Sequence, residues 1–518
     1  MPPSGRDDTL DSMVLLVLEG MGPMWIDRLR SCPGTRLGRL LGSGSSCSVK
    51  IPTGPGRNAV ATTLATGDTP SKHVVIGRRE PDRISMEVRN IDARSWRLEP
   101  FWSEVVRSRR TTAVVGWPVL DPVTEWTVSG DDPSIGQTLV GTDALTSRQD
   151  PADAWLLPPM SVHPEATRPL VRSNRVHVDE REDLTPLRAF GESIVNVSRA
   201  LLLETEPDLL VSWIPFPEEF DRERDPAEVD FLDPLLESIG DRPLALLALP
   251  RLPAQPNMLL ARPPARLFLH GCSLGPDEGS SMWDVDLAGL VCRLLGLDFK
   301  PTSRPVVDPD LFLERARQRA ARFLASGFNP FRTQARRRVY ASSMSYRDVI
   351  IGLDQFERGD LGAARDFLTE VVQSTASEIG IVYLARALIA SGKQDHVERL
   401  VESLPSGSDL RRSVAAAHAV MKDEPTIVSE LLTQPPTSSV CLGFMLESLL
   451  RIGATDRACA LLHGSERGQL LGLSYRDRRI GMICARRSGK APLCAVLARL
   501  VLMMRPDRAR LRRFLRPG

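Results

Sequence analysis

The first residues of the chain that could do chemistry stand at the end of a short apolar segment. Residues 14–18 read VLLVL and run directly into Glu19, which Gly20 and Gly22 follow. Short apolar runs that end in such a turn predict a strand buried on both faces of a sheet. Glu19 would then place a carboxylate at the carboxyl edge of the sheet, where open α/β sheets bind their ligands.

A second polar segment follows about forty residues later. Residues 62–73 read TTLATGDTPSKH, with a Thr-Gly turn, a proline and a histidine. Together with the strand that ends at Glu19, this segment resembles the alkaline phosphatase superfamily, and in particular its type I phosphodiesterase/nucleotide pyrophosphatase branch. Members of that branch read roughly I-x-G-x-D-G at the first strand and T-L-x-T-G-x-x-P-x-x-H-G after the helix that carries the nucleophile.

Further segments agree with this resemblance and keep the family's order, so that the similarity covers about residues 12–310. Residues 101–106 and 113–118 look like a helix and its following strand, residues 206–210 like the entry to a later strand, and residues 284–297 like the closing helix. The resemblance implies an α/β domain with a central sheet flanked by helices. The strands expected from the apolar runs are residues 14–18, 112–116, 209–213 and 244–249.

The resemblance implies a metal-dependent site whose main residues are altered in this chain. In this superfamily two metal ions, usually zinc, flank the phosphate, activate a Ser or Thr nucleophile and stabilise the leaving oxygen. Glu19 stands where the family has its first aspartate, and Arg57, ten residues before Gly67, stands where it has its nucleophile. Because an arginine cannot attack a phosphate, we predict a catalytically degenerate site.

The other ligand positions of the family are altered as well. Where the family has Asp-x-x-x-His, the best-aligned residues are Glu218 and Arg222, and where it has Asp-His-Gly, residues 246–251 contain neither ligand. His270 is the only candidate for the last histidine, and we expect it on a different strand edge. His73 matches the family motif, but in relatives it is a turn residue and not a ligand.

Two residues at the altered nucleophile position could still bind an anion. Arg57 and Asn58 are adjacent, and a guanidinium makes bidentate hydrogen bonds with phosphate. The alternative for Arg57 is a structural role beside the former pocket.

A competing hypothesis keeps the chemistry in a rebuilt site. Thr53 would act as the nucleophile, and Glu19 and Glu218 would hold one zinc or manganese ion. The chain would then be a metal-dependent phosphodiesterase or phosphohydrolase. With a degenerate site we expect no cofactor.

The last third of the chain contains an internal repeat. Gly359, Gly392, Asp423 and Gly453 are spaced by 33, 31 and 30 residues, and a small or aliphatic residue follows each of them at plus five and plus nine. This period is close to the ~34 residues of helix-turn-helix repeats, in which small residues permit close packing of paired helices. Residues 346–518 therefore predict an all-α, tetratricopeptide-like array that binds a protein partner.

Three further segments lie between or beyond these two parts. Residues 118–185 are rich in Pro, Asp, Ser and Thr and predict an excursion or cap over the sheet. Residues 311–345 predict an arginine-rich helical connector. Residues 505–516 predict a basic C-terminal helix, either a cap of the array or a docking tail for an acidic partner.

Composition argues against several classes of function. The 66 basic and 65 acidic residues give a net charge of +1, which provides no field to attract nucleic acid or a membrane. Acidic residues precede the first apolar run and Glu19 interrupts it, unlike a secretory signal. The eight cysteines form no Cys-x-x-Cys pair, so we expect neither a disulfide framework nor a cysteine-based zinc site. We expect a cytoplasmic, bacterial protein.

The preferred function follows from the altered site and the repeats. The chain would be a catalytically degenerate alkaline-phosphatase-like protein that acts in scaffolding or recognition through residues 346–518. A further possibility is a subunit of a larger assembly in which both parts serve only as interfaces.

Overall fold

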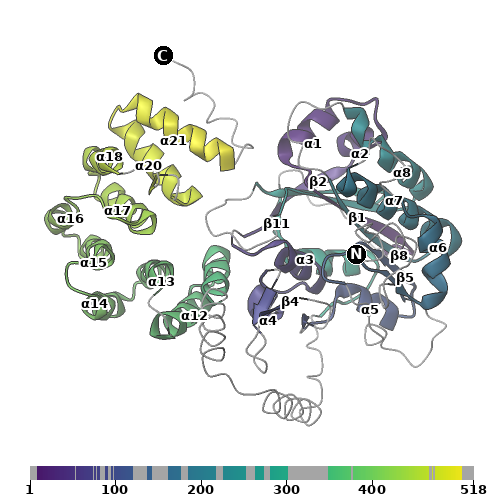
Figure 1. Ribbon diagram of the computed structural model, residues 1–518, viewed down its shortest axis with the longest axis horizontal. Coiled ribbons are helices and arrows are strands. Elements are labelled where there is room, and N and C mark those ends of the chain that lie inside the picture. Colours follow the sequence, from purple (N-terminus) through teal and green to yellow (C-terminus); the bar gives the residue numbers. More distant parts are fainter. Residues whose placement is uncertain are drawn as a thin grey trace, which may run out of the picture.

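The structure is a computed structural model in which the chain forms a sheet domain and an array of helices (Figure 1). It describes most of residues 9–300, the sheet domain, and of residues 348–504, the helical array. The interruptions are residues 53, 74, 78, 82–87, 92–94, 97, 121–136, 143–161, 177–184, 217–225, 253–262, 273–279, 375–376, 466–468 and 471–472.

Within the described residues, a nine-stranded sheet has the order β11-β2-β10-β9-β1-β8-β5-β6-β7. The five strands from β9 to β6 run parallel to one another, whereas β10 and β7 run antiparallel to their neighbours. The strands are β1 (Met13–Glu19), β2 (Ser45–Lys50), β5 (Thr112–Val115), β6 (Gln137–Val140), β7 (Val162–His163), β8 (Leu209–Pro215), β9 (Leu244–Leu249), β10 (Ala265–His270) and β11 (Ser281–Trp283). A separate hairpin joins β3 (Arg79–Pro81) and β4 (Val88–Asn90).

Helices cover both faces of the sheet, and β1 contributes to both of the resulting cores. Leu15 and Val17 of β1 belong to the core under α3, α5 and α9, and Leu16 and Leu18 to the core under α1, α2, α7 and α8. The helices are α1 (Pro23–Arg30), α2 (Arg36–Ser43), α3 (Arg57–Thr66), α4 (Pro70–His73), α5 (Phe101–Arg107), α6 (Arg168–Ser173), α7 (Pro186–Glu204), α8 (Asp233–Ile239) and α9 (Asp286–Leu294). Because both faces are buried, the central strands are largely apolar, with Glu19 at the end of β1 and Ser212 in β8 as polar exceptions.

The four strands expected from the apolar runs are confirmed as β1, β5, β8 and β9. The expectation that residues 118–185 lie outside the sheet is wrong for β6 and β7, which extend the sheet beyond β5. These strands have four and two residues, too few for a periodic pattern to stand out from the polar sequence around them.

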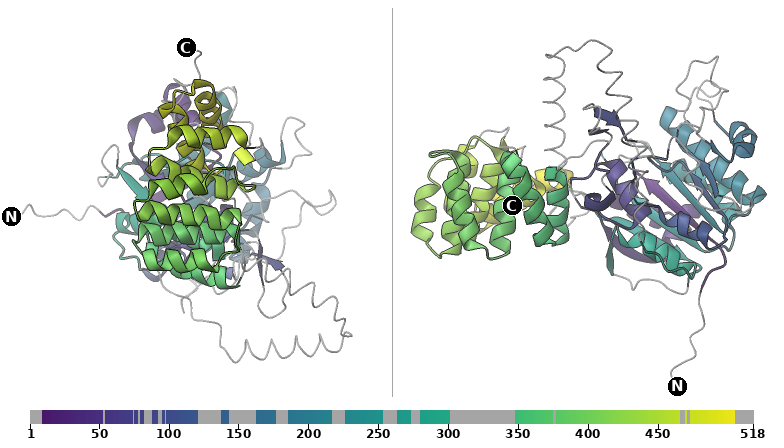
Figure 2. Two further views of the ribbon diagram at one scale, coloured as in Figure 1. Left: turned by 90° about the vertical axis from the view of Figure 1, so that its left-hand side faces the viewer. Right: turned by 90° about the horizontal axis from the view of Figure 1, so that it is seen from below.

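The helical array consists of helix pairs stacked on one another (Figure 2). A helix of residues 348–358, which we call the docking helix, begins the array. The first helices of the pairs are the docking helix, α13 (Glu378–Ala390), α15 (Asp409–Met421), α17 (Ser439–Arg451) and α20 (Tyr475–Arg487). The second helices are α12 (Leu361–Ser374), α14 (Gln394–Ser403), α16 (Pro425–Leu431), α18 (Thr455–Gly464) and α21 (Ala491–Met504).

The repeat anchors found in the sequence lie one or two residues beyond the ends of the first helices. Gly359, Gly392, Asp423 and Gly453 have left-handed φ angles of 88°, 67°, 57° and 76°. The N–H of the next residue donates to the carbonyl five positions earlier, as in a Schellman motif. Gly489 ends α20 in the same way with φ 67°, so the array has a repeat that the sequence analysis missed. The helical array itself is confirmed.

The docking helix joins the array to the sheet domain. Nε2 of Gln355 donates to Oγ of Ser71 at 2.8 Å, and Arg358 pairs with the buried Asp284 at 2.9 Å. Ile350 packs on the sheet domain in a small apolar cluster with Ile76. The interface therefore combines an ion pair, hydrogen bonds and apolar packing.

The predicted connector, residues 311–345, and the basic segment, residues 505–516, lie outside the described residues. Among the helices that the structure describes, none is long and apolar enough to cross a membrane.

Candidate functional site

Glu19 occupies the carboxyl edge of the sheet, where the sequence placed it. As the last residue of β1 it pairs with Pro215 of β8 on one side and Leu249 of β9 on the other. Only 6% of the residue is exposed. Its Oε2 accepts hydrogen bonds from Nε of Arg57 at 2.6 Å and from Nε1 of Trp213 at 2.8 Å. The carboxylate is thus held by an arginine and an indole.

Helix α3 brings Arg57 to this carboxylate. Arg57 is the first residue of α3, and the N-cap Gly56 offers no side chain to cap the helix. The side chain of Arg57 is 27% exposed, and its guanidinium carbon lies 5.9 Å from the ring centroid of Trp213. Asn58 is the next residue of α3 and is half-buried. The two residues predicted to bind an anion therefore stand together at the start of a helix, where anions are favoured.

Trp213 is a site residue that the sequence analysis treated only as part of a strand. Its ring packs edge-to-face on Trp117 with the centroids 5.0 Å apart, and Trp117 packs in the same way on Trp102 at 5.2 Å. All three rings are fully buried. This packing fixes the orientation of the indole N–H that donates to Glu19. The available signal was the position of Trp213 near the end of a strand beside β1.

Arg251 is a second residue that sequence analysis missed. It follows β9 by two residues and interacts electrostatically with Glu19 and Arg57. Burial lowers the pKa of Arg251, Glu19 raises it and Arg57 lowers it, with a net decrease. Two guanidinium groups and one carboxylate leave one positive charge in excess among these three residues.

The described residues at this edge do not fit a pair of metal ions. A bound metal needs several converging carboxylate, imidazole or thiolate donors at about 2 Å. The described part of the chain contains no group of three or more His, Cys, Asp or Glu side chains that could hold a metal ion. Oε2 of Glu19 already accepts two hydrogen bonds. Thr53 and Glu218, the nucleophile and second ligand of the alternative hypothesis, lie outside the described residues.

The histidine of the family motif, His73, has structural contacts. It is fully buried, and its Nδ1 accepts a hydrogen bond from the N–H of Val75 at 3.2 Å. Nε2 lies 2.9 Å from Oγ1 of Thr63, to which it donates in the neutral tautomer that the Val75 contact selects. His73 therefore ties α4 to α3, in agreement with the turn role expected for it.

His270 lies at the opposite edge of the sheet from Glu19. It ends β10, which runs antiparallel to β9, and it pairs with Leu244 at the start of β9. Glu19 pairs with Leu249 at the other end of that strand. Burial lowers the pKa of His270. The expectation that His270 sits on a different strand edge is confirmed.

Comparison with known families adds to this geometry. Residues 13–227 match the family model described as type I phosphodiesterase / nucleotide pyrophosphatase. The resemblance found in the sequence is confirmed for this stretch, which includes Glu19, Arg57 and Trp213. No curated protein sequence matches the chain.

Solved structures are similar to about half of this chain at low identity. Phosphonoacetate hydrolase from Sinorhizobium meliloti, in complex with phosphonoformate, is 15% identical with a TM-score of 0.33 over 46% of this chain and 55% of that chain. The murine ectonucleotide pyrophosphatase/phosphodiesterase 5, an inactive variant in complex with AMP, is 12% identical with a TM-score of 0.35 over 57% of this chain and 97% of that chain. The human protein is 11% identical with a TM-score of 0.35 over 57% and 96%. The chain spans about half the length of the phosphonoacetate hydrolase.

Proposed function

We propose that the sheet domain is a catalytically degenerate relative of the phosphodiesterases, and that the chain acts as a protein-binding or scaffolding module through its helical array. The observation that supports this proposal is the Glu19–Arg57 ion pair, with Nε and Oε2 2.6 Å apart. It stands where the resemblance requires a metal-ligating carboxylate and a nucleophile. A guanidinium has no lone pair with which to attack phosphorus.

Electrostatics argue against metal binding beside this pair. At an effective dielectric constant of about 20, a divalent cation about 4 Å from a guanidinium is repelled by roughly 8 kcal/mol, which offsets its attraction to a carboxylate at the same distance. A metal that used Glu19 would have to displace Arg57 from a contact that also orients the carboxylate. Loss of even one group that stabilises a transition state typically costs ~10²–10³ in rate.

The same charges favour binding of an anion without its cleavage. Arg57 stands at the start of α3, and Arg251 adds a second guanidinium nearby. Backbone N–H groups at a helix start and bidentate guanidinium groups are the usual partners of phosphate. A phosphorylated ligand at this edge would be held without a nucleophile among the described side chains that contact Glu19.

The helical array supplies the protein-binding half of the proposal. Stacked helix pairs form an extended inner surface that is suited to a polypeptide partner. We place this activity in the cytoplasm, because all eight cysteines are free thiols, and free thiols are typical of a reducing compartment.

The decisive experiment measures metal content and phosphodiester turnover of the full chain. After exposure to zinc or manganese and removal of free ions, we expect less than one tightly bound metal per chain and no turnover of bis-(p-nitrophenyl) phosphate above the background. Glu237→Ala, which removes an exposed carboxylate of α8, is the matched control for weakly bound surface metal. Stoichiometric metal with turnover that Glu19→Ala abolishes would establish the alternative, a metal-dependent phosphodiesterase with a rebuilt site.

A further inference from the structure

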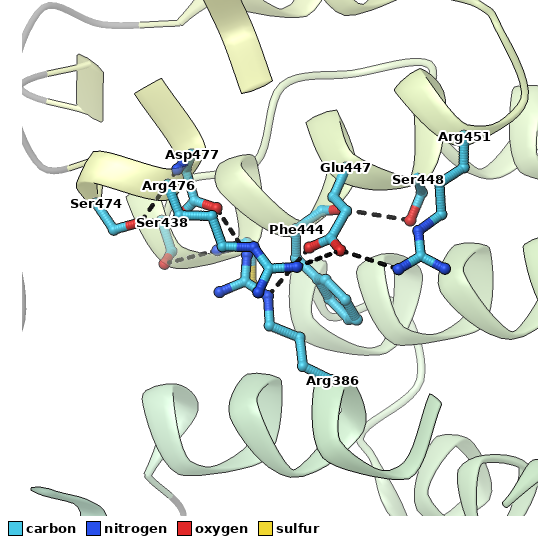
Figure 3. Close-up of polar contacts among 10 residues, drawn as sticks. Arg386, Ser438, Phe444, Glu447, Ser448, Arg451, Ser474, Arg476 and Asp477 are labelled. Carbon is cyan, nitrogen blue, oxygen red and sulfur yellow. Dashed lines mark hydrogen bonds and ion pairs between the residues drawn. The ribbon is translucent and has the colours of Figure 1, made fainter. Parts of the chain in front are cut away.

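A small, partly open pocket lies on the inner face of the helical array. Its lining residues all come from the first helices of the pairs: the docking helix, α13, α15, α17 and α20. Ile389, Ala417 and Val420 give the pocket an apolar wall, and Arg386, Arg451 and Arg476 give it three guanidinium groups. Figure 3 shows these arginines converging on Glu447.

Arg386 forms the buried floor of this pocket. Its side chain is 2% exposed, and it donates from Nε to Glu447 at 3.2 Å and from a terminal nitrogen to Asp477 at 2.7 Å. The guanidinium lies over the rings of Tyr383 and Phe444 at 4.9 and 5.4 Å. Both of its partners are carboxylates on other helices, so the ion pairs at the floor of the pocket join three helices in a rigid network.

Close packing around Asp477 indicates that this network is built to a fixed geometry. A Cβ at Gly443 would lie 2.3 Å from the carboxyl carbon of Asp477, so only glycine fits on α17 at that point. Oγ of Ser474 donates to the second oxygen of Asp477 at 2.6 Å. One oxygen of Asp477 accepts from Ser474 and the other accepts from Arg386, so the carboxylate is held in a fixed orientation.

Arg451 and Arg476 form the rim of the pocket. Both donate to Oε1 of Glu447, at 3.2 and 2.7 Å. Their side chains are 50% and 45% exposed, so both are within reach of a ligand. Each guanidinium carries five N–H donors, of which this contact uses one.

The charges of the five hydrogen-bonded side chains in this network do not balance, and Glu357 of the docking helix acts on the same cluster without being one of them. Arg386, Arg451 and Arg476 face two carboxylates, those of Glu447 and Asp477, which leaves one positive charge in excess among these five side chains. A further carboxylate bridging the two rim arginines would neutralise that excess. A phosphoryl group, with a charge of about −2, would overshoot it and would be repelled by Glu447.

We propose that this pocket binds a carboxylate of a partner polypeptide between Arg451 and Arg476, with the neighbouring apolar side chain of the partner on the Ile389–Val420 wall. The inference deepens the proposed protein-binding function by assigning its chemistry, an acidic and partly apolar peptide. The carboxylate can belong to an Asp or Glu side chain or to a chain terminus.

The test uses the full chain and fluorescence anisotropy with a labelled probe, an octapeptide of alternating leucine and glutamate. We expect saturable binding that weakens at least tenfold in the double variant Arg451→Gln/Arg476→Gln. The matched control, Arg365→Gln/Arg399→Gln, removes the same charge from second helices α12 and α14 and should change the affinity less than twofold. Circular dichroism spectra that coincide below the unfolding transition confirm that the three proteins keep the fold, and the rim variant should unfold at a lower temperature because it loses two contacts to Glu447.

Further probes define the ligand. The same peptide with an amidated terminus separates the two sources of the carboxylate: loss of binding on amidation assigns the terminus, and unchanged binding assigns the side chains. A leucine–lysine peptide should not bind.

Three results would overturn the assignment. They are the absence of saturable binding to wild type, equal affinity of wild type and the rim variant, or at least tenfold tighter binding of a probe with phosphoserine in place of glutamate. Peptide binding that the rim variant does not weaken would reject the pocket while leaving protein binding by the array in place, so the two failures are distinguishable.

Discussion

At the scale of single residues, the sheet edge is defined by what Glu19 contacts. A carboxylate that is 6% exposed needs partners, and here they are the guanidinium of Arg57 and the indole of Trp213. The two residues that the sequence analysis aligned with a metal ligand and a nucleophile are thus partners of each other. The contact is structural as well as electrostatic, because it joins β1, β8 and α3.

Substitutions of Glu19 test this view. Glu19→Ala leaves the N–H groups of Arg57 and Trp213 without their acceptor and should lower the free energy of unfolding by about 1–3 kcal/mol. Glu19→Gln keeps an amide oxygen as acceptor and should cost less. Urea denaturation measures both, with Glu237→Ala as an exposed control expected within about 0.5 kcal/mol of wild type. Equal losses for Ala and Gln would contradict the hydrogen-bonding role.

At the scale of elements, each repeat depends on the residue that ends its first helix. Four of the five positions are glycine, and Asp423 is the exception, with a φ of 57°. An L-residue pays a steric penalty in this region that glycine avoids.

Two substitutions separate this backbone effect from packing. Gly453→Ala should destabilise the array by about 1 kcal/mol through its φ of 76° alone, because an added Cβ meets no atom within 4 Å. Asp423→Gly should stabilise it by a few tenths to about 1 kcal/mol. Thermal unfolding followed by circular dichroism gives both values. A neutral Gly453→Ala would show that the left-handed turn is not needed there.

Glu447 gives the array an acid-sensitive point. Burial acts to raise its pKa, but Arg386, Arg476 and Arg451 outweigh burial, so the pKa lies below its ordinary value. The charged form therefore stabilises the folded array above the unfolded pKa of about 4.3, and this stabilisation is lost as the pH falls through the folded pKa.

The corresponding variant is Glu447→Gln. Its loss of unfolding free energy relative to wild type should be full at neutral pH and should shrink below about pH 4, where wild type loses the same charge. Glu402→Gln, an exposed position on α14, is the control and should run parallel to wild type. A difference that stays constant down to pH 3 would refute the assigned pKa direction.

At the scale of the whole molecule, the docking helix couples the two parts. Arg358 is 9% exposed at its side chain and bridges Asp284 of the sheet domain and Asp354 of its own helix. Burial acts to lower the pKa of Arg358, but the two carboxylates outweigh it and raise the pKa, so the side chain remains charged. The interface is thus fixed by a buried ion pair.

Breaking this pair should separate the unfolding of the two parts. Arg358→Ala removes a guanidinium that both Asp284 and Asp354 contact, a loss of about 3–5 kcal/mol for a buried pair. Calorimetry should then resolve two transitions where wild type gives one. Arg365→Ala, at an exposed ion pair on α12, should leave the wild-type profile unchanged. A single transition in Arg358→Ala would mean that the pair does not couple the parts.

The sequence predicted the elements of the fold better than the contacts of the site. Apolar runs and repeat anchors are local signals, and they located β1, β5, β8, β9 and four of the repeats. The sequence analysis missed Gly489 as a repeat anchor because it follows Gly453 by 36 residues, a longer spacing than between the other anchors. The partners of Glu19 and Arg386 lie far away in the chain, with Trp213 separated from Glu19 by 194 residues. Such pairings depend on strand order and helix stacking, which residue spacing does not encode.

The position of Phe356 has a practical consequence for anyone who cuts the protein in two. This ring packs against Tyr383 with the centroids 5.9 Å apart and lines the pocket of Arg451 and Arg476. It belongs to the docking helix, as do Ile350 and Ile351. A fragment of the array that includes Phe356 also includes both isoleucines. Without the sheet domain these isoleucines lose their contact with Ile76 and become exposed to solvent. Such a fragment should bind unrelated proteins nonspecifically through its exposed isoleucines. Pull-down experiments should therefore use the intact polypeptide as bait.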